Sequence, residues 1–367
     1  MLLLVKHGKK VLKKFTFFLI LIFVAVSLFF AQTVIENPKK PLISDSVRTL
    51  KIQELLRIKD IGENFYFQYP RFIKVAADRT IFVYDQDELL RFDQTGKFLH
   101  NFYKKGQGPG ELNYVRNYTF QDLRLIIHSA NPNKIVWFDF NGTLIKDLKI
   151  FDIPGSLRFQ LLYDNTYYFW KSEIPARAEK LKSVEIPQVL VAVDQNGKII
   201  EGLVSFPIKS YMLGGAFVQY STVRSVPYKN RYLFISYTRE YSVKLFDIES
   251  KKVLRTFNRD YNRVKTPKDY RGASISYEGK QYGPGQEKFL SDIDNLFVFD
   301  DLLWVVTSTK DKKHRPLIDV FNFEGKYVDA FYLDVSGSLV ATHEDILFVR
   351  EKDEDELIHI VKYRVID

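Results

Sequence analysis

A repeated turn motif constrains the fold of this chain more than any other feature. An apolar segment is followed by Asp or Asn, two further residues, Gly or Ser, and a second apolar segment. This spacing recurs at Asp93/Gly96, Asp139/Gly142, Asp194/Gly197, Asp247/Ser250 and Asn322/Gly325. The Asx side chain closes a turn of this kind, and Gly adopts a positive φ at little steric cost. Each copy therefore predicts a β-hairpin.

A second, shorter turn precedes each hairpin. These turns contain Asp78, Asp122, Asp164, Asn230, Asp300 and Asp345. The repeating unit is thus a four-stranded antiparallel meander, with strands a to d and tight a–b and c–d turns. Aromatic residues, at 15% of the chain, also favour strands over helices.

The two ends of the repeat array predict how it closes. Six a–b turns are present but only five c–d hairpins, because the chain ends at Asp367, where the sixth would begin. A strand-like segment at 49–60 precedes the first unit and has no partner there. A closed ring explains both features if this segment supplies the outer strand of the last unit. We therefore expect an all-β fold, a six-bladed β-propeller of four-stranded blades.

The chain divides into three parts. Residues 1–31 hold five lysines followed by an uncharged apolar run over 15–30, which predicts a signal peptide or an uncleaved N-terminal anchor. Residues 32–48 are polar and contain proline, which predicts a linker. Residues 49–367 form the single propeller domain. Export places the protein in the periplasm, on a membrane tether or outside the cell.

Charge and composition narrow the function classes. The net charge of +9 falls to +4 without the lysines of the leader, so the sequence gives no reason to expect nucleic acid as a partner. There is no cysteine, and the six histidines show no metal-ligand spacing. We expect no cofactor, although oxygen ligands from separate blades leave calcium open. A monomer is expected.

The longest connections all join strands b to c or d to a, which places them on one face of the ring. They include 104–116, 171–188, 206–220 and 258–288. Because long loops on a rigid scaffold often carry function, this face is the expected working surface. The long 258–288 segment lacks a strand-like apolar run, so no seventh blade is expected there.

One loop carries a recognisable motif. Gly106, Gln107, Gly108, Gly110 and Glu111 lie in the sequence KGQGPGE, and a partial copy occurs at 283–287. This motif resembles the GxGPGE signature of secreted bacterial six-bladed β-propellers related to NHL-repeat proteins. The resemblance implies the same fold and export. The glycines either offer backbone N–H groups to an anion or fasten two blades together.

Other candidate residues lie on inner strands and insertions. Asp292 and Asp294 alternate on an inner strand, where two carboxylates face the same side. They either bind a cation or a basic group in the channel, or are solvated, or pair with inner-strand arginines such as Arg71, Arg158 or Arg224. Aromatic residues on the insertions either form a recognition platform for a peptide or glycan or simply cover the top of the blades. These are Tyr211, Phe217, Tyr220, Tyr261, Tyr277 and Tyr282.

These features favour an exported, non-enzymatic binding module. It would contact a protein, peptide or glycan through the b–c and d–a loops and the mouth of the channel. The alternative is a metal-dependent hydrolase or lyase with its site at the same mouth. No catalytic residue and no metal ligand can be assigned from the sequence.

Overall fold

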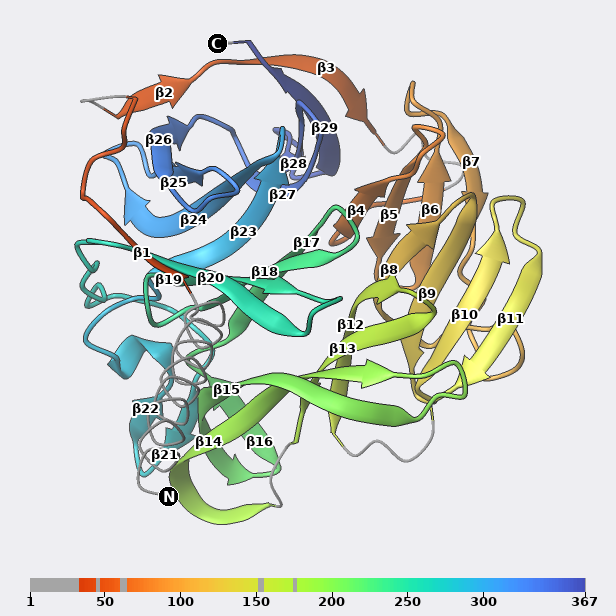
Figure 1. Cartoon of the computed structure of the whole chain (residues 1–367), viewed down its shortest axis with the longest axis horizontal. Coiled ribbons are helices and arrows are strands. Elements are labelled where there is room, and N and C mark those ends of the chain that lie inside the picture. Colours follow the sequence, from red (N-terminus) through yellow and green to blue (C-terminus); the bar gives the residue numbers. More distant parts are fainter. Residues whose placement is uncertain (1–32, 44–46, 60–64, 151–154, 174–176, 367) are drawn as a thin grey trace, which may run out of the picture.

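Six β-sheets surround a central axis in the computed structural model (Figure 1). The structure describes residues 33–43, 47–59, 65–150, 155–173 and 177–366. The predicted leader, 1–31, lies outside these ranges. In the described ranges, no helix has the length and apolar character needed to cross a membrane.

The first three blades follow the chain in order. Blade 1 contains β4 (Arg71–Val75), β5 (Ile81–Asp85), β6 (Glu88–Phe92) and β7 (Phe98–Asn101). Blade 2 contains β8 (Tyr114–Gln121), β9 (Arg124–Ala130), β10 (Lys134–Asp139) and β11 (Leu144–Lys149). Blade 3 contains β12 (Ser156–Tyr163), β13 (Thr166–Ser172), β14 (Ala178–Val193), β15 (Ile199–Gly214) and β16 (Ala216–Gln219).

The last three blades each receive an outer strand from the N-terminal part of the chain. Blade 4 contains β17 (Val223–Tyr228), β18 (Tyr232–Tyr237), β19 (Ser242–Asp247), β20 (Lys252–Arg259) and β1 (Thr33–Asn37). Blade 5 contains β23 (Ile293–Phe299), β24 (Leu302–Lys310), β25 (Pro316–Phe321), β26 (Tyr327–Leu333) and β2 (Arg48–Leu50). Blade 6 contains β27 (Ser338–His343), β28 (Ile346–Lys352), β29 (Ile358–Val365) and β3 (Ile52–Ile58).

The predicted ring closure is confirmed. Strand β3 pairs antiparallel with β29, in a register that sets Ile58 opposite Ile360 and Ile52 opposite Val365. In Figure 1, β3 passes directly outside β29 beside the C-terminus. The inner strands also contact one another around the whole ring, in the order β4, β8, β12, β17, β23 and β27 and back to β4. The sixth blade therefore fastens the N-terminal and C-terminal parts of the domain.

The repeated turns form as the motif predicts. In the first one, Asp93 Oδ1 accepts hydrogen bonds from the backbone N–H of Thr95 (2.8 Å) and Lys97 (3.0 Å), and Gly96 has a φ of +83°. The same pattern of acceptors recurs at Asp139 and Asp194. Local turn chemistry therefore sets the c–d hairpins of successive blades.

Several expectations about individual segments were wrong. Residues 32–48 do not form only a linker, because β1 and the start of β2 join blades 4 and 5 as parallel edge strands. Blades 4 and 5 consequently have five strands rather than four, and blade 3 has a fifth strand of its own, β16. The segments 171–188 and 206–220 are largely strand, since β14 and β15 continue past the blade as a long hairpin.

The 258–288 insertion forms no seventh blade. It contains a small hairpin of β21 (Ile275–Tyr277) and β22 (Lys280–Tyr282), followed by the 3₁₀ turn η1 (Pro284–Gln286). This hairpin packs near the long hairpin of blade 3, through contacts of β21 with β15 and β16. Two insertions from neighbouring blades therefore gather on one side of the ring.

The hydrophobic core lies between neighbouring blades. One buried cluster includes Phe82 of blade 1 and Leu125 of blade 2, and another includes Trp170 of blade 3 and Ile235 of blade 4. The cluster around Ile58, Phe92 and Ile360 joins blade 6 to blade 1. Face-to-face packing of twisted sheets explains why apolar residues occur on both faces of the middle strands.

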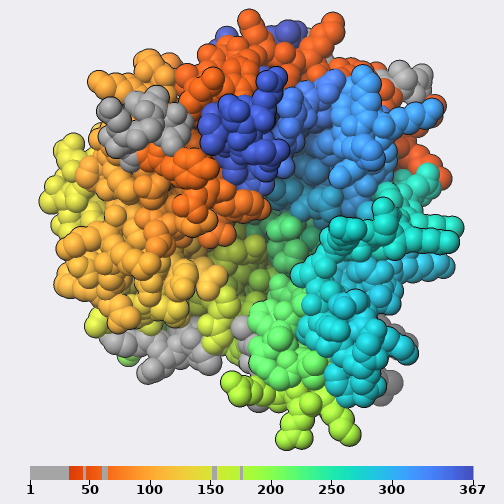
Figure 2. All heavy atoms as spheres, turned by 180° about the vertical axis from the view of Figure 1, so that it is seen from behind, coloured from red at the N-terminus to blue at the C-terminus, as the bar shows by residue number. Residues whose placement is uncertain are grey.

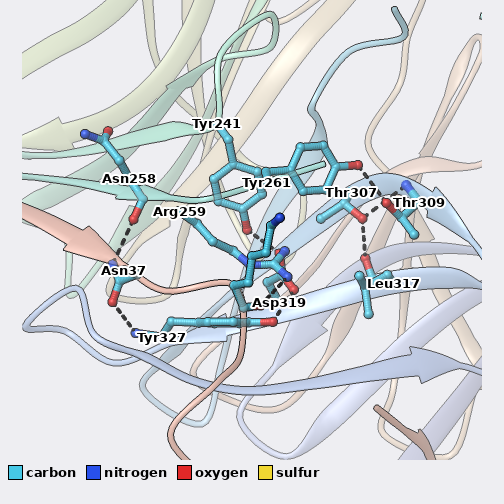
Figure 3. A network of polar contacts seen from close by, with 11 residues as sticks. Asn37, Tyr241, Asn258, Arg259, Tyr261, Thr307, Thr309, Leu317, Asp319 and Tyr327 are labelled. Atoms are coloured by element: carbon cyan, nitrogen blue, oxygen red, sulfur yellow. Dashed lines mark hydrogen bonds and ion pairs between the residues drawn. The ribbon is translucent and has the colours of Figure 1, made fainter. Parts of the chain in front are cut away.

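A buried polar network attaches the N-terminal segment to blades 4 and 5 (Figure 3). The Asn37 side chain donates 3.0 Å hydrogen bonds to the carbonyl oxygens of Asn258 and Gly325, and its Oδ1 accepts one of 2.9 Å from Tyr327 N–H. Beside it, Asp319 is fully buried and contacts Arg259. This network crosses the interface between two blades, so the N-terminal segment is an integral part of the domain.

Candidate functional site: the arginine-lined channel mouth

Two adjoining cavities open at the face that carries the b–c and d–a connections. Figure 2 shows a hollow near the centre of this face, bordered by green strand segments and the cyan insertion. The first cavity has a volume of about 290 Å³ and the second about 320 Å³, and both are lined by Gln219 and Thr222. The first lies against blades 1 to 3. The second lies against blades 4 and 5 and the 258–288 insertion.

Arginines converge on these cavities from equivalent places in successive blades. Arg71 begins β4, and Arg116, Arg158 and Arg224 each directly follow a buried apolar residue at the start of an inner strand. Arg71, Arg116 and Arg158 line the first cavity, and Arg224 lines the second. Among the described residues that line the first cavity there is no acidic side chain. The repeat therefore places positively charged side chains from four of the six blades side by side at the mouth of the channel.

A β-bulge presents Arg116 at this mouth. The pairing of β8 with β9 passes from Val115 opposite Ser129 to Asn117 opposite His128, so Arg116 has no partner in the ladder. Bulges of this kind redirect a side chain out of the regular alternation. Arg116 is exposed, and within the described part of the chain its guanidinium has neither a hydrogen bond nor an ion pair.

Arg158 has the most unusual electrostatic environment at the mouth. Its Nη2 donates a 3.0 Å hydrogen bond to the carbonyl oxygen of Val223, while its buried Nε has no partner among the described residues. Burial and the positive charge of Arg224 lower the pKa of Arg158 to about 10. The guanidinium is still charged at neutral pH, and within the described ranges no carboxylate offsets the cost of its partial burial.

The charged side chains around the second cavity balance one another more closely than those around the first. Arg224 Nε donates a 2.8 Å hydrogen bond to the carbonyl oxygen of Asp294, and the Asp294 carboxylate partly opposes the lowering of the pKa of Arg224 by burial. Arg239 forms a 3.0 Å ion pair with Glu287 from the insertion. The excess of positive charge therefore lies in the first cavity.

Neutral polar groups and apolar surface complete the first cavity. Ser156, Ser172, Gln188, Gln219 and Thr222 contribute hydroxyl and amide groups. The side chain of Gln188 is buried, and its Oε1 has no hydrogen-bond partner within the described ranges. Trp170, Ile186 and Phe217 also line the cavity, and Phe217 is 38% exposed.

The expected aromatic platform forms only in part. Tyr211 stacks on Tyr220 with ring centroids 4.9 Å apart, and Tyr282 meets Tyr211 edge-on at 5.7 Å. Tyr220 also lines the second cavity, so this trio borders the mouth. Tyr261 instead packs on Tyr241 beside the Asp319 network. Tyr277 lies on the β21–β22 hairpin and Phe217 in the first cavity.

The KGQGPGE loop fastens blade 1 to blade 2. Its glycine N–H groups already have partners: Gly106 donates to the carbonyl oxygen of Leu112, Gly108 to Glu111 Oε2 and Gly110 to Asp147 Oδ2. The buried Lys134 joins the Gly108 carbonyl oxygen to Asp147, with both contacts at 2.8 Å. The acceptors that an external anion would supply are therefore provided by the chain itself. Gln107 lies in the same loop.

Asp292 and Asp294 do not form a carboxylate pair. Asp292 precedes β23, is buried and accepts a 2.8 Å hydrogen bond from Arg263 Nε of the insertion. Asp294 is the bulged residue between Ile293 and Asn295, and its carboxylate accepts a 3.1 Å hydrogen bond from Ser308. Burial raises the pKa of both carboxyl groups. The bulge breaks the alternation on which the prediction rested.

Metal-ligating side chains do not gather at the mouth. In the ranges that the structure describes, no group of three or more His, Asp or Glu is placed to hold a metal ion. We therefore assign no residue to a cation.

Arg116 was missed by the sequence analysis, which named only Arg71, Arg158 and Arg224. A signal was present, because Val115–Arg116, Leu157–Arg158 and Val223–Arg224 are the same apolar–arginine pair at the start of consecutive inner strands. The pair becomes visible only when the inner strands are aligned by blade.

Comparison with known proteins agrees with the architecture. Residues 42–319 match the model of a family described as "6-bladed beta-propeller". No curated protein matches the chain. A crystal structure of a protein from Bacteroides fragilis, which its title names as exported, covers 91% of this chain and 100% of its own, with 11% identity and a TM-score of 0.58.

Two further solved structures show weaker similarity. A protein of unknown function from Bacteroides caccae matches with 12% identity and a TM-score of 0.40, over 74% of this chain and 85% of its own. The Pan2 WD40 domain of Neurospora crassa matches with 10% identity and a TM-score of 0.41, over 89% of this chain and 98% of its own.

Proposed function

The chain belongs to the 6-bladed beta-propeller family, and from this premise we propose that it is an exported binding module of the bacterial cell envelope. Its ligand enters the two adjoining cavities at the channel mouth and carries a negatively charged group. The inner arginines bind that group, and the insertions of blade 3 and of residues 258–288 border the entrance.

The observation that carries this proposal is the half-buried charge of Arg158, which has no carboxylate partner among the described residues. Taking a cation out of water without a counter-ion costs several kcal/mol, and a second cation nearby adds to that cost. Arg158 faces Arg224, and the first cavity has no acidic side chain among its described lining. An anionic ligand offsets this cost on binding, and guanidinium groups favour carboxylate, sulfate and phosphate geometry.

Export is supported by two independent features. The basic and apolar leader at 1–31 is typical of a targeting segment. The Bacteroides fragilis structure that shares the fold is named as exported. The first feature belongs to this chain itself, whereas the second is only a statement about a distant relative.

A pair of arginine variants tests the proposal. Arg116 and Arg124 lie at opposite ends of the β8–β9 hairpin, so Arg116→Ala removes a charge at the mouth and Arg124→Ala removes one on the opposite face. Binding of polyglutamate, polygalacturonate and dextran sulfate is measured by calorimetry, with neutral dextran as the reference.

We expect at least one polyanion to bind, and Arg116→Ala to weaken its binding by about tenfold, in a salt-dependent way. Arg124→Ala should change the affinity by less than about twofold. Equal effects of the two variants, or no binding of any polyanion, would contradict the proposal.

A further inference from the structure

Two unpartnered polar atoms belong to side chains that line the first cavity, and together they indicate more than an anion. Arg158 Nε is a buried donor without an acceptor, and Gln188 Oε1 is a buried acceptor without a donor. Both residues line the same cavity. Buried polar groups are normally paired, and each unpaired one costs about 1–3 kcal/mol. The cavity therefore suits a ligand that presents an anionic oxygen and a hydrogen-bond donor together.

An inorganic anion meets only half of this requirement. Fully ionised sulfate accepts from Arg158 but has no donor for Gln188. A sugar acid supplies both, because its carboxylate or sulfate accepts from guanidinium groups and its ring hydroxyls donate and accept. Hydroxyl groups also match Ser156, Ser172 and Thr222 of the lining, which themselves both donate and accept.

The apolar part of the lining fits a sugar ring as well. Phe217 is 38% exposed and Tyr114 is 53% exposed, and both line the first cavity. A pyranose has an apolar C–H face that packs against such rings while its hydroxyls stay hydrogen-bonded. The volume of about 290 Å³ lies at the lower end of the range for small-molecule pockets, roughly 300–1,000 Å³.

A peptide fits less well. Extended peptides bind proteins most simply by adding a strand to a regular sheet edge. Bulges interrupt β8 at Arg116, β12 at Gln160 and β23 at Asp294, so the regular edge at the mouth is confined to the six-residue strand β17. Isolated pockets, rather than a continuous ladder, line the mouth.

We infer that the ligand is an acidic saccharide. Its anionic group binds Arg158, with Arg71 and Arg116 beside it, and a ring hydroxyl donates to Gln188 Oε1. A longer saccharide continues past Gln219 and Thr222 into the second cavity, beside Tyr220 and Tyr270. This inference rests on the proposed function and narrows its ligand class.

Matched pairs of soluble probes test it. The pairs are tri-galacturonate with carboxyl-reduced trigalactose, sialyllactose with lactose, and a sulfated with an unsulfated chondroitin disaccharide. Tri-glutamate serves as an acid without a sugar. Affinities are measured by calorimetry for the whole exported chain and for two variants of Gln188.

We expect at least one acidic saccharide to bind about tenfold or more tightly than its neutral counterpart and than tri-glutamate. Gln188→Leu should weaken the binding of that saccharide by about tenfold and the binding of tri-glutamate by much less. Gln188→Glu adds a carboxylate to the lining of the cavity that also holds Arg158, so it should abolish binding of all anions and raise the melting temperature. The rise in melting temperature shows that the variant folds.

The outcomes separate this inference from the proposed function. Tri-glutamate binding that depends on Arg116, with no acidic saccharide preferred over its neutral partner, overturns the saccharide inference alone. Binding of acidic and neutral sugars with equal affinity overturns the anionic role of the arginines. Failure of every probe, together with failure of the polyanions above, overturns both.

Discussion

Arg158 of blade 3 donates its 3.0 Å hydrogen bond to the carbonyl oxygen of Val223, the residue that precedes Arg224 in blade 4. This contact brings two guanidinium groups from neighbouring blades close enough for the charge of Arg224 to lower the pKa of Arg158. Because the repeat places equivalent residues side by side around the ring, an arginine at one inner position in several blades creates a concentrated positive field. Repetition of one residue thus gathers positive charge at the mouth of the channel.

Arg158→Met is expected to remove anion binding without a large loss of stability. The variant loses one hydrogen bond but also removes a buried, uncompensated charge, so the free energy of unfolding should change by less than about 1 kcal/mol. Urea unfolding measures this change.

Arg57→Met is the matched comparison for Arg158→Met. It leaves the nearly buried Glu351 without its cation and should cost about 1–3 kcal/mol. A loss above about 3 kcal/mol for Arg158→Met would show that Arg158 is primarily a structural residue.

Lys134→Met should destabilise the domain because it breaks the fastening of the KGQGPGE loop. Lys134 is 1% exposed and contacts both Asp147 and the carbonyl oxygen of Gly108. Removing it leaves a partly buried carboxylate without its cation, at a cost of about 3 kcal/mol. Thermal and urea unfolding measure this loss, and anion binding at the mouth should persist in the folded fraction.

Lys105→Met provides the control in the same loop. Lys105 is 70% exposed in its ion pair with Asp87, so its replacement should cost less than about 1 kcal/mol. Equal losses for the two lysines would contradict the structural role of the loop. If Lys134→Met alone lost anion binding while keeping normal stability, the result would indicate that the glycine N–H groups of the KGQGPGE loop bind the anion.

Much of the fold could be predicted because its turns are local. Asp93 and Gly96 determine their hairpin through contacts within five residues. Because the sequence has one c–d hairpin fewer than a–b turns, the last blade needed an outer strand from elsewhere in the chain. The long hairpin of blade 3 gave no comparable signal. The outer half of β14 is mostly exposed, whereas that of β15 alternates between buried and exposed side chains. Pro187 also lies opposite Pro207, a residue type that normally argues against a strand interior.

The site was harder to predict than the fold, for two physical reasons. Arg116 and Asp294 lie on bulges, where the two-residue alternation fails, and a sequence pattern cannot locate a bulge. The short strands β1 and β2 form only because the surface of blades 4 and 5 accepts them as parallel edges.

Asn37→Ala tests whether the N-terminal segment stabilises the blades that it covers. The substitution removes three hydrogen bonds and leaves the buried Tyr327 N–H without an acceptor. The free energy of unfolding should fall by about 2–3 kcal/mol. Urea unfolding is the measurement.

Val34→Ala is the control on the same strand. Val34 is 55% exposed, so its truncation should cost less than about 0.5 kcal/mol. Equal free energies of unfolding for the Asn37 and Val34 variants would show that the N-terminal segment contacts the blades without stabilising them. Polyanion binding should be unchanged in both, because neither residue lines a cavity at the mouth.

His128→Leu should reduce the acid sensitivity of the domain. His128 is fully buried on β9, and burial, aided by the charge of Arg116 and opposed by Asn133, lowers its pKa to about 3. In the unfolded chain the imidazole pKa is about 6.5, so between pH 6.5 and 3 the unfolded state binds a proton that the folded state does not. Stability therefore falls as the pH falls through this range.

The contribution of His128 between pH 7 and pH 5 is about 2 kcal/mol. Urea unfolding at both pH values should show a loss of stability that is smaller by this amount in His128→Leu than in the unmodified chain. Other groups titrate equally in the two proteins and cancel in the comparison. Identical losses in both proteins would mean that the imidazole takes up a proton within the folded domain, which its full burial in the core of blade 2 opposes.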